Sequence, residues 1–331
     1  MPSYRRIVLA SRPTGAASLS NFRLEEVQTP TLQPGQFLVR NEWLSLDPYM
    51  RGRMNEGKSY AAAQPVGVVM VGGTAGTVVE SRHAQFKAGE KVVANLGWQE
   101  FGVSDGTGVY RADTRVVPLS AYLGAVGMPG VTAWYGLKKV IEPKEGETIL
   151  VSAATGAVGG VVGQLAKLAG CRAVGIAGGP EKCTYAVIEL GFDACIDYKS
   201  QDVNRALKDA APQGVDGYFE NVGGEIMNAV LPRMNAFGRI ALCGLIAGYD
   251  GQPIPIVNPT WFLVNRLKLQ GFIVSEHMEL WPQALKELGT QVATGGIKYR
   301  ETVANGIENA PQAFLGMLRG ANFGKQLVKL A

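Results

Sequence analysis

The chain has 331 residues, 47% of them hydrophobic and 18% charged, with a formal net charge of +4. This composition is typical of a folded globular protein and excludes a disordered one. Lys and Arg are scattered without a dense basic run, which excludes a nucleic-acid-binding footprint and nucleic-acid partners. The length suits two domains.

The N-terminus carries Arg5 and Arg6 ahead of only four apolar residues, too few for the core of a signal peptide. No later apolar run approaches the length that spans a membrane. We therefore expect a cytoplasmic protein without a membrane partner.

The first part of the chain, residues 6–123, consists of short apolar runs broken by Gly, Pro and Asn. Runs rich in β-branched and aromatic residues predict strands over residues 37–44, 66–71, 76–80, 91–95 and 101–103. Many short strands at this spacing predict a small, strongly bent β-barrel.

A polar and aromatic segment, SLDPYMRGR at residues 45–53, interrupts these strands. Asp47 followed by Pro48 is a good helix start, with Asp as the cap and Pro at the first helical position. Tyr49, which follows, fits a packed turn residue or the wall of a binding pocket. The pattern leaves both interpretations open.

Residues 127–136, GMPGVTAWYG, mark a change of pattern. Strand and helix patterns alternate beyond this point, and residues 131–140 predict the helix that leads into a second domain. The predicted boundary therefore falls near residue 125.

Residues 148–163, TILVSAATGAVGGVVG, run from a β-branched strand through a glycine-spaced turn into a helix. Gly156, Gly159 and Gly163 have the spacing GxxGxxxG, a relative of the dinucleotide fingerprint GxGxxG. We expect Gly156 to allow the tight turn, Gly159 to let the backbone approach a pyrophosphate, and Gly163 to let the helix pack on the strand. The N–H groups at the helix start would then face the phosphates.

Glycines near a strand also occur as plain turn residues, but the context favours a nucleotide site. The following helix, residues 158–169, has one apolar face, and residues 172–177 predict a second strand, which completes a βαβ unit.

The residue at the end of this second strand distinguishes a site for NAD from a site for NADP. An NAD site carries an Asp or Glu there to bind the ribose 2′-hydroxyl. Gly178 holds that position in this chain, and Lys182 lies at the start of the next helix. A cation at a helix N-terminus favours a 2′-phosphate, so the sequence predicts NADP unless Lys182 is only a solvated lysine.

The alternation continues to the end of this domain. Helices are predicted over residues 182–190, 203–210, 225–234, 259–265 and 280–294, and strands over residues 194–197, 215–221, 238–243 and 268–274. Six strands with crossovers make a doubly wound parallel sheet. Ligands of such sheets lie at the carboxyl ends of the strands, so we expect Asn221 and Tyr249 to face the cofactor.

The tail predicts a strand over residues 299–303, a helix over residues 307–318 and a strand over residues 324–328, which return to the first domain. This gives a catalytic domain of residues 1–125 and 299–331, and a nucleotide-binding domain of residues 126–298.

Metal chemistry has little support in the sequence. Only two histidines exist, His83 and His277, and neither has a Cys or carboxylate at ligand spacing. The four cysteines lack CxxC spacing and are expected to be reduced and mostly buried: Cys171, Cys183, Cys195 and Cys243. No metal is therefore expected.

Tyrosines remain as the candidate proton donors. Tyr249 follows the fifth strand of the predicted sheet, and Tyr49 lies in the polar segment of the other domain. A phenol, with an ordinary pKa of ~10, can donate a proton to a developing enolate oxygen. Either residue fits a packed wall position equally well.

The chain resembles the zinc-independent members of the medium-chain dehydrogenase/reductase superfamily, in the group of leukotriene B4 dehydrogenase, prostaglandin reductase and curcumin-reductase-type enzymes. The resemblance covers nearly the full chain and is carried by LSLDPYMRGRM, GMPGVTAWYGL, AATGAVGGVVGQLAK, FENVGG, CGLIAGYD and NFGKQLVK. It implies a Rossmann domain, a GroES-like catalytic domain and usually a homodimer formed through the Rossmann domain.

The resemblance further implies NADPH-dependent reduction of a carbon–carbon double bond conjugated to a ketone or aldehyde. In this family the enolate is held by a tyrosine or by the nicotinamide ribose hydroxyl. Tyr249 matches the tyrosine that acts as proton donor or holds the enolate oxygen, and Tyr49 matches a pocket tyrosine. The matching motifs place cofactor contacts at Thr155, Gly156, Ala157, Val158, Gly159, Lys182, Tyr198, Asn221, Cys243, Gly244, Leu245, Ile246, Ala247, Gly248, Tyr249, Phe272, Ile273, Val274 and Asn322.

The match has departures. Ala247 and Gly248 stand where relatives often have a polar pair, and residues 58–64 vary between members, so the substrate does not carry over. Two alternatives stay open: a quinone reductase of the same superfamily, and a non-catalytic protein that binds NADPH.

Overall fold

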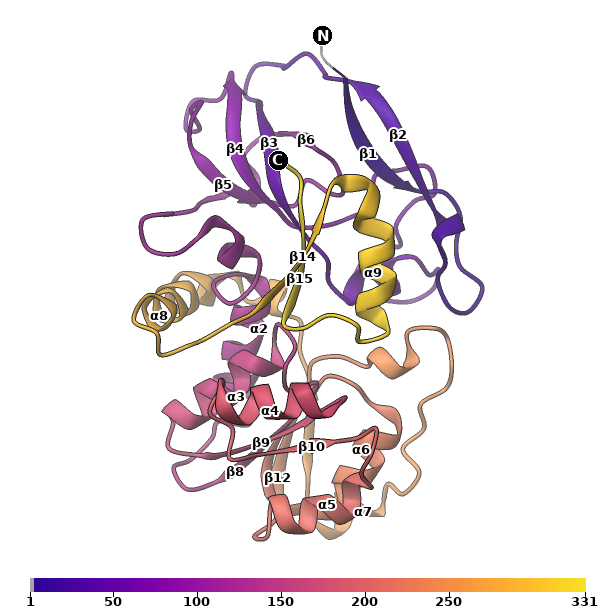
Figure 1. The fold of residues 1–331 in the computed structure, drawn as a ribbon, viewed down its shortest axis with the longest axis vertical. Helices are drawn as coiled ribbons and strands as arrows, with labels where there is room; N and C mark the ends of the chain where they lie inside the picture. Colours follow the sequence, from indigo (N-terminus) through magenta and orange to yellow (C-terminus); the bar gives the residue numbers. More distant parts are fainter. Residues whose placement is uncertain (1–2) are drawn as a thin grey trace. The chain divides into compact units, whose positions relative to one another are not determined.

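The structure is a computed structural model that describes residues 3–331. The chain forms two compact units, one of Met1–Gly124 with Glu301–Ala331 and the other of Ala125–Arg300. Figure 1 shows the strands and helices of both units along the chain. Among the described residues, no helix is long and apolar enough to cross a membrane.

The first unit contains a mixed sheet with the strand order β14-β15-β3-β4-β5-β7, and β6 also pairs with β3. Only β14 and β15 pair in parallel. Its strands are β3 (Phe37–Ser45), β4 (Thr74–Ser81), β5 (Lys91–Ala94), β6 (Phe101–Ser104), β7 (Tyr110–Arg111), β14 (Glu301–Asn305) and β15 (Lys325–Lys329).

Strand β3 organises this sheet because three strands pair with it. Its pairing with β4 shifts register between Asn41 and Trp43, where the strand bulges. Gly76 faces this bulge, and a Cβ built on it would lie 2.1 Å from the carbonyl oxygen of Arg40. Only glycine fits where the two backbones approach so closely.

A second, two-stranded sheet pairs β1 (Ser3–Leu9) with β2 (Phe22–Gln28). The core of the unit lies between these strands and α9 (Ala310–Leu318). Phe314 of α9 packs edge-on against Trp98 and Phe22, with ring centroids 5.4 Å and 6.1 Å away.

Most of the strands predicted for this unit are confirmed, but residues 66–71 form no strand. Gly67 has a φ of +82°, which ends any extended run, and the segment pairs with β1 only through an isolated bridge at Val69. The sequence also failed to predict β1, β2 and β7.

The second unit contains a six-stranded parallel sheet with the order β10-β9-β8-β11-β12-β13. This is the order of a Rossmann fold, with the switch point between β8 and β11. The strands are β8 (Thr148–Ser152), β9 (Arg172–Ala177), β10 (Ala194–Asp197), β11 (Val215–Glu220), β12 (Met234–Leu242) and β13 (Lys268–Gly271). The predicted doubly wound sheet, accompanied by a separate β-rich unit, is confirmed.

Helices cover both faces of this sheet. Residues of α2 (Met128–Tyr135), α3 (Gly159–Leu168), α4 (Pro180–Ile188) and α8 (Trp281–Ala293) share one apolar core. Residues of α5 (Val203–Ala210), α6 (Gly224–Val230) and α7 (Thr260–Val264) contribute to the core on the other face. β-strand side chains alternate between the two cores, as Leu150 and Val151 illustrate.

Several predicted boundaries were wrong. The helix predicted for residues 131–140 is α2, which begins at Met128 and continues as a π-helical segment over Gly136–Ile141. The helix predicted for residues 225–234 ends at Val230, and a 3₁₀ turn, Leu231–Arg233, follows it. The sixth strand stops at Gly271, before residues 272–274.

Candidate functional site

The carboxyl ends of β8 and β11, on either side of the switch point, are joined by polar contacts. Asn221 donates its backbone N–H to Ser152 Oγ at 2.8 Å and its side-chain Nδ2 to the Ser152 carbonyl at 2.7 Å. Ser152 Oγ donates to Glu220 Oε1 at 2.7 Å. The side chain of the predicted cofactor contact Asn221 is therefore fixed at the place where Rossmann folds bind dinucleotides.

Glu220, the last residue of β11, is fully buried and acts as the acceptor of this network. Tyr218 donates its hydroxyl to Glu220 Oε2, and the backbone N–H of Val222 donates to Glu220 Oε1 at 2.5 Å. Burial, reinforced by the nearby carboxylate, raises the pKa of the Tyr218 phenol well above its ordinary value. The network holds the turn that follows β11 in one conformation.

The turn between β8 and α3 is shaped by close backbone packing. The left-handed residue is Ala153, with a φ of 50°, and Gly156 has no positive φ. A Cβ on Gly159 would lie 2.3 Å from the Ala153 carbonyl oxygen, and one on Gly163 would lie 1.9 Å from the Phe192 ring. The expected roles therefore change: Gly159 is required by the turn itself, and Gly163 makes room for Phe192 rather than for the strand.

A cluster with two lysines lies at the ends of β9 and β10. A Cβ on Gly178 would lie 2.9 Å from the Tyr198 ring and 3.1 Å from Cε of Lys199. Burial lowers the pKa of Lys182 in α4, and the Lys199 ammonium lowers it further. A bound anion would relieve this repulsion between like charges.

The Asp197 carboxylate at the end of β10 accepts hydrogen bonds from its own loop and from the residue before α4. It accepts from the N–H of Gly179 at 2.7 Å, from the N–H of Lys199 at 3.1 Å and from Ser200 Oγ at 2.8 Å. Gly179 has a φ of +109°, a conformation that favours glycine. Asp197 thus links Gly179, which precedes the helix of Lys182, to the turn that carries Lys199.

The loop after β12 carries Cys243 and the residues up to Tyr249. It folds into a 3₁₀ turn, Ile246–Gly248, and Tyr249 follows directly. A Cβ on Gly244 would lie 3.6 Å from the Tyr249 phenol oxygen, so this hydroxyl lies over the carboxyl end of β12. Burial raises the pKa of the Cys243 thiol to about 12, with Glu220 adding to the effect, so the thiol stays protonated at neutral pH.

Phe272, just beyond β13, lies in a row of aromatic rings. Its centroid is 6.1 Å from Phe219 of β11 and 5.4 Å from Tyr135 of α2. Tyr135 stacks on His277 at 4.4 Å, and its hydroxyl is 2.8 Å from His277 Nε2. These contacts hold the predicted segment 272–274 against the edge of the sheet.

Two of the predicted site residues, Tyr49 and Asn322, belong to the first unit. Tyr49 is the first residue of α1 (Tyr49–Arg53), and burial raises the pKa of its phenol, with Asp47 adding to the effect. Asn322 donates its side-chain N–H to the carbonyl of Gly324 at 2.7 Å.

The expected cap of α1 is wrong. The N-cap is Pro48, and the Asp47 carboxylate accepts from Ser45 Oγ and from Lys325 Nζ, the latter at 2.8 Å. The buried ammonium of Lys325 outcompetes the helix N–H groups for the carboxylate.

The sequence did not indicate four residues that shape these sites: Ser152, Asp197, Lys199 and Glu220. A signal existed for two of them, since Ser152 and Glu220 are polar residues at the ends of otherwise apolar strands.

A metal does not fit the described residues. Across residues 3–331, no group of three or more His, Cys, Asp or Glu side chains is placed to hold an ion. The thiols form no disulfide among the described residues: Cys171, Cys183, Cys195 and Cys243. Only Cys171 is buried and the other three are partly exposed, so the expectation of mostly buried thiols is wrong.

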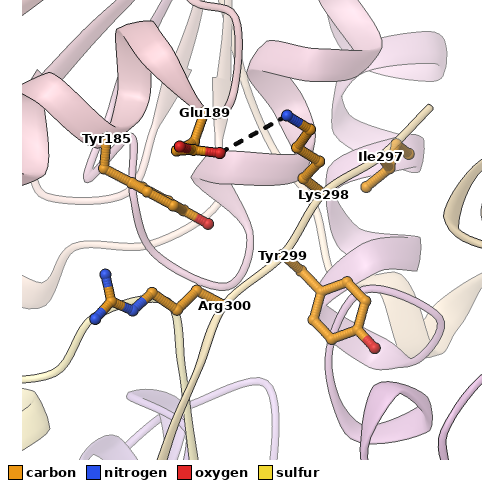
Figure 2. Close-up of a pocket in the computed structure, with 6 residues that line it drawn as sticks. All are labelled: Tyr185, Glu189, Ile297, Lys298, Tyr299 and Arg300. Atoms are coloured by element: carbon orange, nitrogen blue, oxygen red, sulfur yellow. Dashed lines mark ion pairs between the residues drawn. The ribbon is translucent and has the colours of Figure 1, made fainter. Parts of the chain in front are cut away.

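A pocket of about 420 Å³ lies between α4 and residues 297–300 (Figure 2). The Arg300 guanidinium is 5.9 Å from the centre of the Tyr185 ring, and Lys298 forms an ion pair with Glu189 at 3.7 Å. Tyr185 is one helical turn from Lys182 on α4. This pocket is lined by none of the residues that the sequence predicted.

Comparisons with known proteins agree with this geometry. Residues 5–112 match the N-terminal domain of oxidoreductase, and residues 157–290 match the family described as zinc-binding dehydrogenase. The chain belongs to the medium-chain dehydrogenase/reductase superfamily of oxidoreductases, so the resemblance of the sequence is confirmed.

Individual relatives cover the full length. The chain is 46% identical to the NADPH-dependent curcumin reductase of Escherichia coli (strain K12), covering 99% of this chain and 97% of that protein. It is 40% identical to the NADP(+)-dependent 2-alkenal reductase of Nicotiana tabacum, covering 99% and 98%. The crystal structure of CurA from Vibrio vulnificus in complex with NADPH has a TM-score of 0.94 at 46% identity and covers 99% of each chain.

Proposed function

We propose that this protein is an NADPH-dependent reductase of the carbon–carbon double bond in α,β-unsaturated ketones and aldehydes. The observation that carries the proposal is the sequence similarity, over nearly the full length, to an NADP(+)-dependent 2-alkenal reductase (40% identical) and an NADPH-dependent curcumin reductase (46% identical). The Rossmann sheet with a lysine pair beside it supports the same cofactor.

The residues of the second unit fit NADPH. The turn at residues 155–159 and the start of α3 offer backbone N–H groups to the pyrophosphate. Lys182, Lys199 and Tyr198 would hold the 2′-phosphate, beside the Asp197 carboxylate, which accepts from the backbone N–H groups of Gly179 and Lys199. Asn221, residues 243–249 and residues 272–274 are proposed to hold the ribose and nicotinamide end.

When bound, NADPH supplies the hydride that adds to the β-carbon of the substrate. Tyr249, whose hydroxyl lies over the carboxyl end of β12, would hold the enolate oxygen by a hydrogen bond from its phenol, and water would supply the proton that the α-carbon takes. Tyr49 is proposed as a further phenol that contacts the substrate. The first unit is proposed to be the GroES-like catalytic domain, and the activity is proposed to be independent of zinc.

We also propose a homodimer formed through the edge of the parallel sheet. Strand β13 is the last strand in the sheet order, so one of its edges has no neighbouring strand. Four large apolar side chains are exposed just before it: Ile256, Val257, Leu263 and Val264. An unpaired edge beside an exposed apolar patch is typical of a subunit interface. The cytoplasmic location expected from the sequence stays a prediction.

NADPH oxidation, followed at 340 nm, tests the proposed reaction. The panel contains a 2-alkenal, an aryl enone, a quinone and the saturated ketone that corresponds to the enone, with NADH in parallel. Turnover of the enal and enone but not of the saturated ketone is the expected result. Turnover of the quinone alone would indicate the quinone reductase, and tight NADPH binding with no turnover would indicate a non-catalytic protein.

A further inference from the structure

A buried ion pair anchors the segment that carries Tyr49. Lys325 Nζ on β15 lies 2.8 Å from Asp47 Oδ1, and both side chains are less than a tenth exposed. The same ammonium donates to the carbonyl of Leu46 at 2.6 Å, and Ser45 Oγ donates to the other carboxylate oxygen of Asp47. One lysine thus fixes two consecutive residues at the entrance to α1.

The other side of this short helix is held by apolar packing. Met50 and Met54 are fully buried in the core of the first unit. The backbone N–H of Met50 donates to the carbonyl of Asp47 at 3.1 Å, which links the anchored residue directly to the helix. Tyr49 lies between the two anchors, so its backbone has little freedom to move.

Stability alone does not explain a charged pair at this place. The cost of removing two charges from water offsets most of their attraction, and an apolar pair of similar volume is often equally stable. Burial lowers the pKa of Lys325, and Asp47 opposes this effect. Unlike an apolar contact, this ion pair is directional, because Lys325 donates hydrogen bonds to two defined acceptors, the Leu46 carbonyl and the Asp47 carboxylate.

We propose that Lys325 and Asp47 are positioning residues that hold Tyr49 in its working place for the reduction. The inference rests on the proposed function and adds two residues to it. Neither residue is proposed to contact the substrate, and both act through the start of α1.

The chain offers a matched control. Glu301 of β14 is the register partner of Lys325 and interacts electrostatically with its ammonium, whereas the hydrogen bonds to the Asp47 carboxylate come from Ser45 and Lys325. Glu301→Gln therefore removes a carboxylate from the same lysine without releasing Asp47. Comparing it with Asp47→Asn separates the anchoring of Tyr49 from a general change of charge.

The test measures kcat and KM for one enone, together with the Kd for NADPH, in the full-length protein. Lys325→Met and Asp47→Asn are expected to lower kcat/KM by about 10- to 100-fold, the scale of a misplaced reacting group. The Kd for NADPH should stay within about twofold, the limit expected for independent sites. Glu301→Gln is expected to keep the wild-type kcat/KM. An equal loss in Glu301→Gln, or no loss in Lys325→Met, would overturn the proposal.

A double-mutant cycle shows whether the pair acts through Tyr49. In the Tyr49→Phe background, Lys325→Met should lower kcat/KM by less than about twofold further, because the effects of coupled residues are not additive. The full loss in both backgrounds would contradict the proposal. Absence of enone turnover by the wild-type protein would instead contradict the proposed function, before any variant is compared.

Lys325→Met leaves Asp47 as a buried, unpaired charge and can fail to fold. The neutral pair Asp47→Asn with Lys325→Met removes that difficulty. It is expected to fold, with a Tm close to that of the wild type, and yet to keep a low kcat/KM. Recovery of wild-type kcat/KM in this double variant would show that the pair serves stability only.

Discussion

Asn221 binds Ser152 through both its backbone and its side chain, with N–H groups 2.8 Å and 2.7 Å from the Ser152 hydroxyl and carbonyl oxygens. These contacts join β8 and β11, the two parallel strands between which the strand order reverses. Ser152 therefore holds the centre of the proposed cofactor site, and this role does not require that it contact the cofactor.

Ser152→Ala removes a donor from the buried Glu220 carboxylate and an acceptor from the Asn221 N–H. We expect the free energy of unfolding to fall by about 1–3 kcal/mol, the cost of leaving a buried polar group unpaired. NADPH should bind more weakly as well. Thermal and urea unfolding measure the first effect, with the exposed Ser275→Ala as control. Equal stability of the two variants would contradict this role.

The lysine pair should decide between NADPH and NADH. Lys182→Ala is expected to raise the Kd for NADPH about tenfold, which corresponds to 1.4 kcal/mol, because a charge-assisted contact to the 2′-phosphate is lost. Lys199→Ala should act in the same direction. The Kd for NADH should not change, and Lys208→Ala, on the exposed side of α5, serves as the control. A fluorescence titration that finds the same change for both cofactors would refute the assignment.

Two helical glycines, Gly163 of α3 and Gly289 of α8, should differ in their tolerance of a methyl group. Gly163→Ala places Cβ 1.9 Å from the Phe192 ring, whereas Cβ at Gly289 in α8 would lie 3.6 Å from Val126. We expect Gly163→Ala to lower the unfolding free energy by about 1–3 kcal/mol through overpacking. Gly289→Ala should be neutral or stabilising, because alanine favours a helix. Equal Tm values would show that Phe192 moves freely.

Glu287 gives the second unit an acid-sensitive contribution to stability. Burial raises its pKa, but hydrogen bonds from Lys138, Trp134 and Gln283 outweigh this and lower it from 4.5 to about 2. A pKa lowered in the folded state stabilises the protein above the unfolded value, and this contribution disappears as the pH falls through the folded value. Glu287→Gln should therefore lower Tm at pH 7, and the difference from the wild type should shrink between pH 4.5 and 2. A pH-independent difference in Tm would exclude this ionisation as the cause.

The parallel sheet could be predicted from the sequence because strands such as β8 and β9 are largely apolar runs that alternate with helical patterns. The predicted bounds of β9, β10 and α5 coincide with those of the structure. The hairpin of β1 and β2 was missed because charged residues such as Arg6 and Glu25, paired at 2.8 Å, occupy its strands and hide the apolar alternation.

The candidate site was only partly predictable, for a physical reason. Glycines, the start of a helix and the ends of strands leave local signals, so the sequence itself proposes Gly159, Lys182 and Asn221 as cofactor contacts. Contacts between distant segments leave no such signal, and the ion pair of Asp47 with Lys325 joins residues far apart in the chain. A local helix-cap signal at Asp47 therefore gave the wrong partner.

The most direct test of the proposed reaction is to identify the product formed from an aryl enone and NADPH, by NMR and mass spectrometry. We predict the saturated ketone, with hydride from NADPH at the β-carbon. An allylic alcohol, formed by reduction of the carbonyl group, would contradict the account.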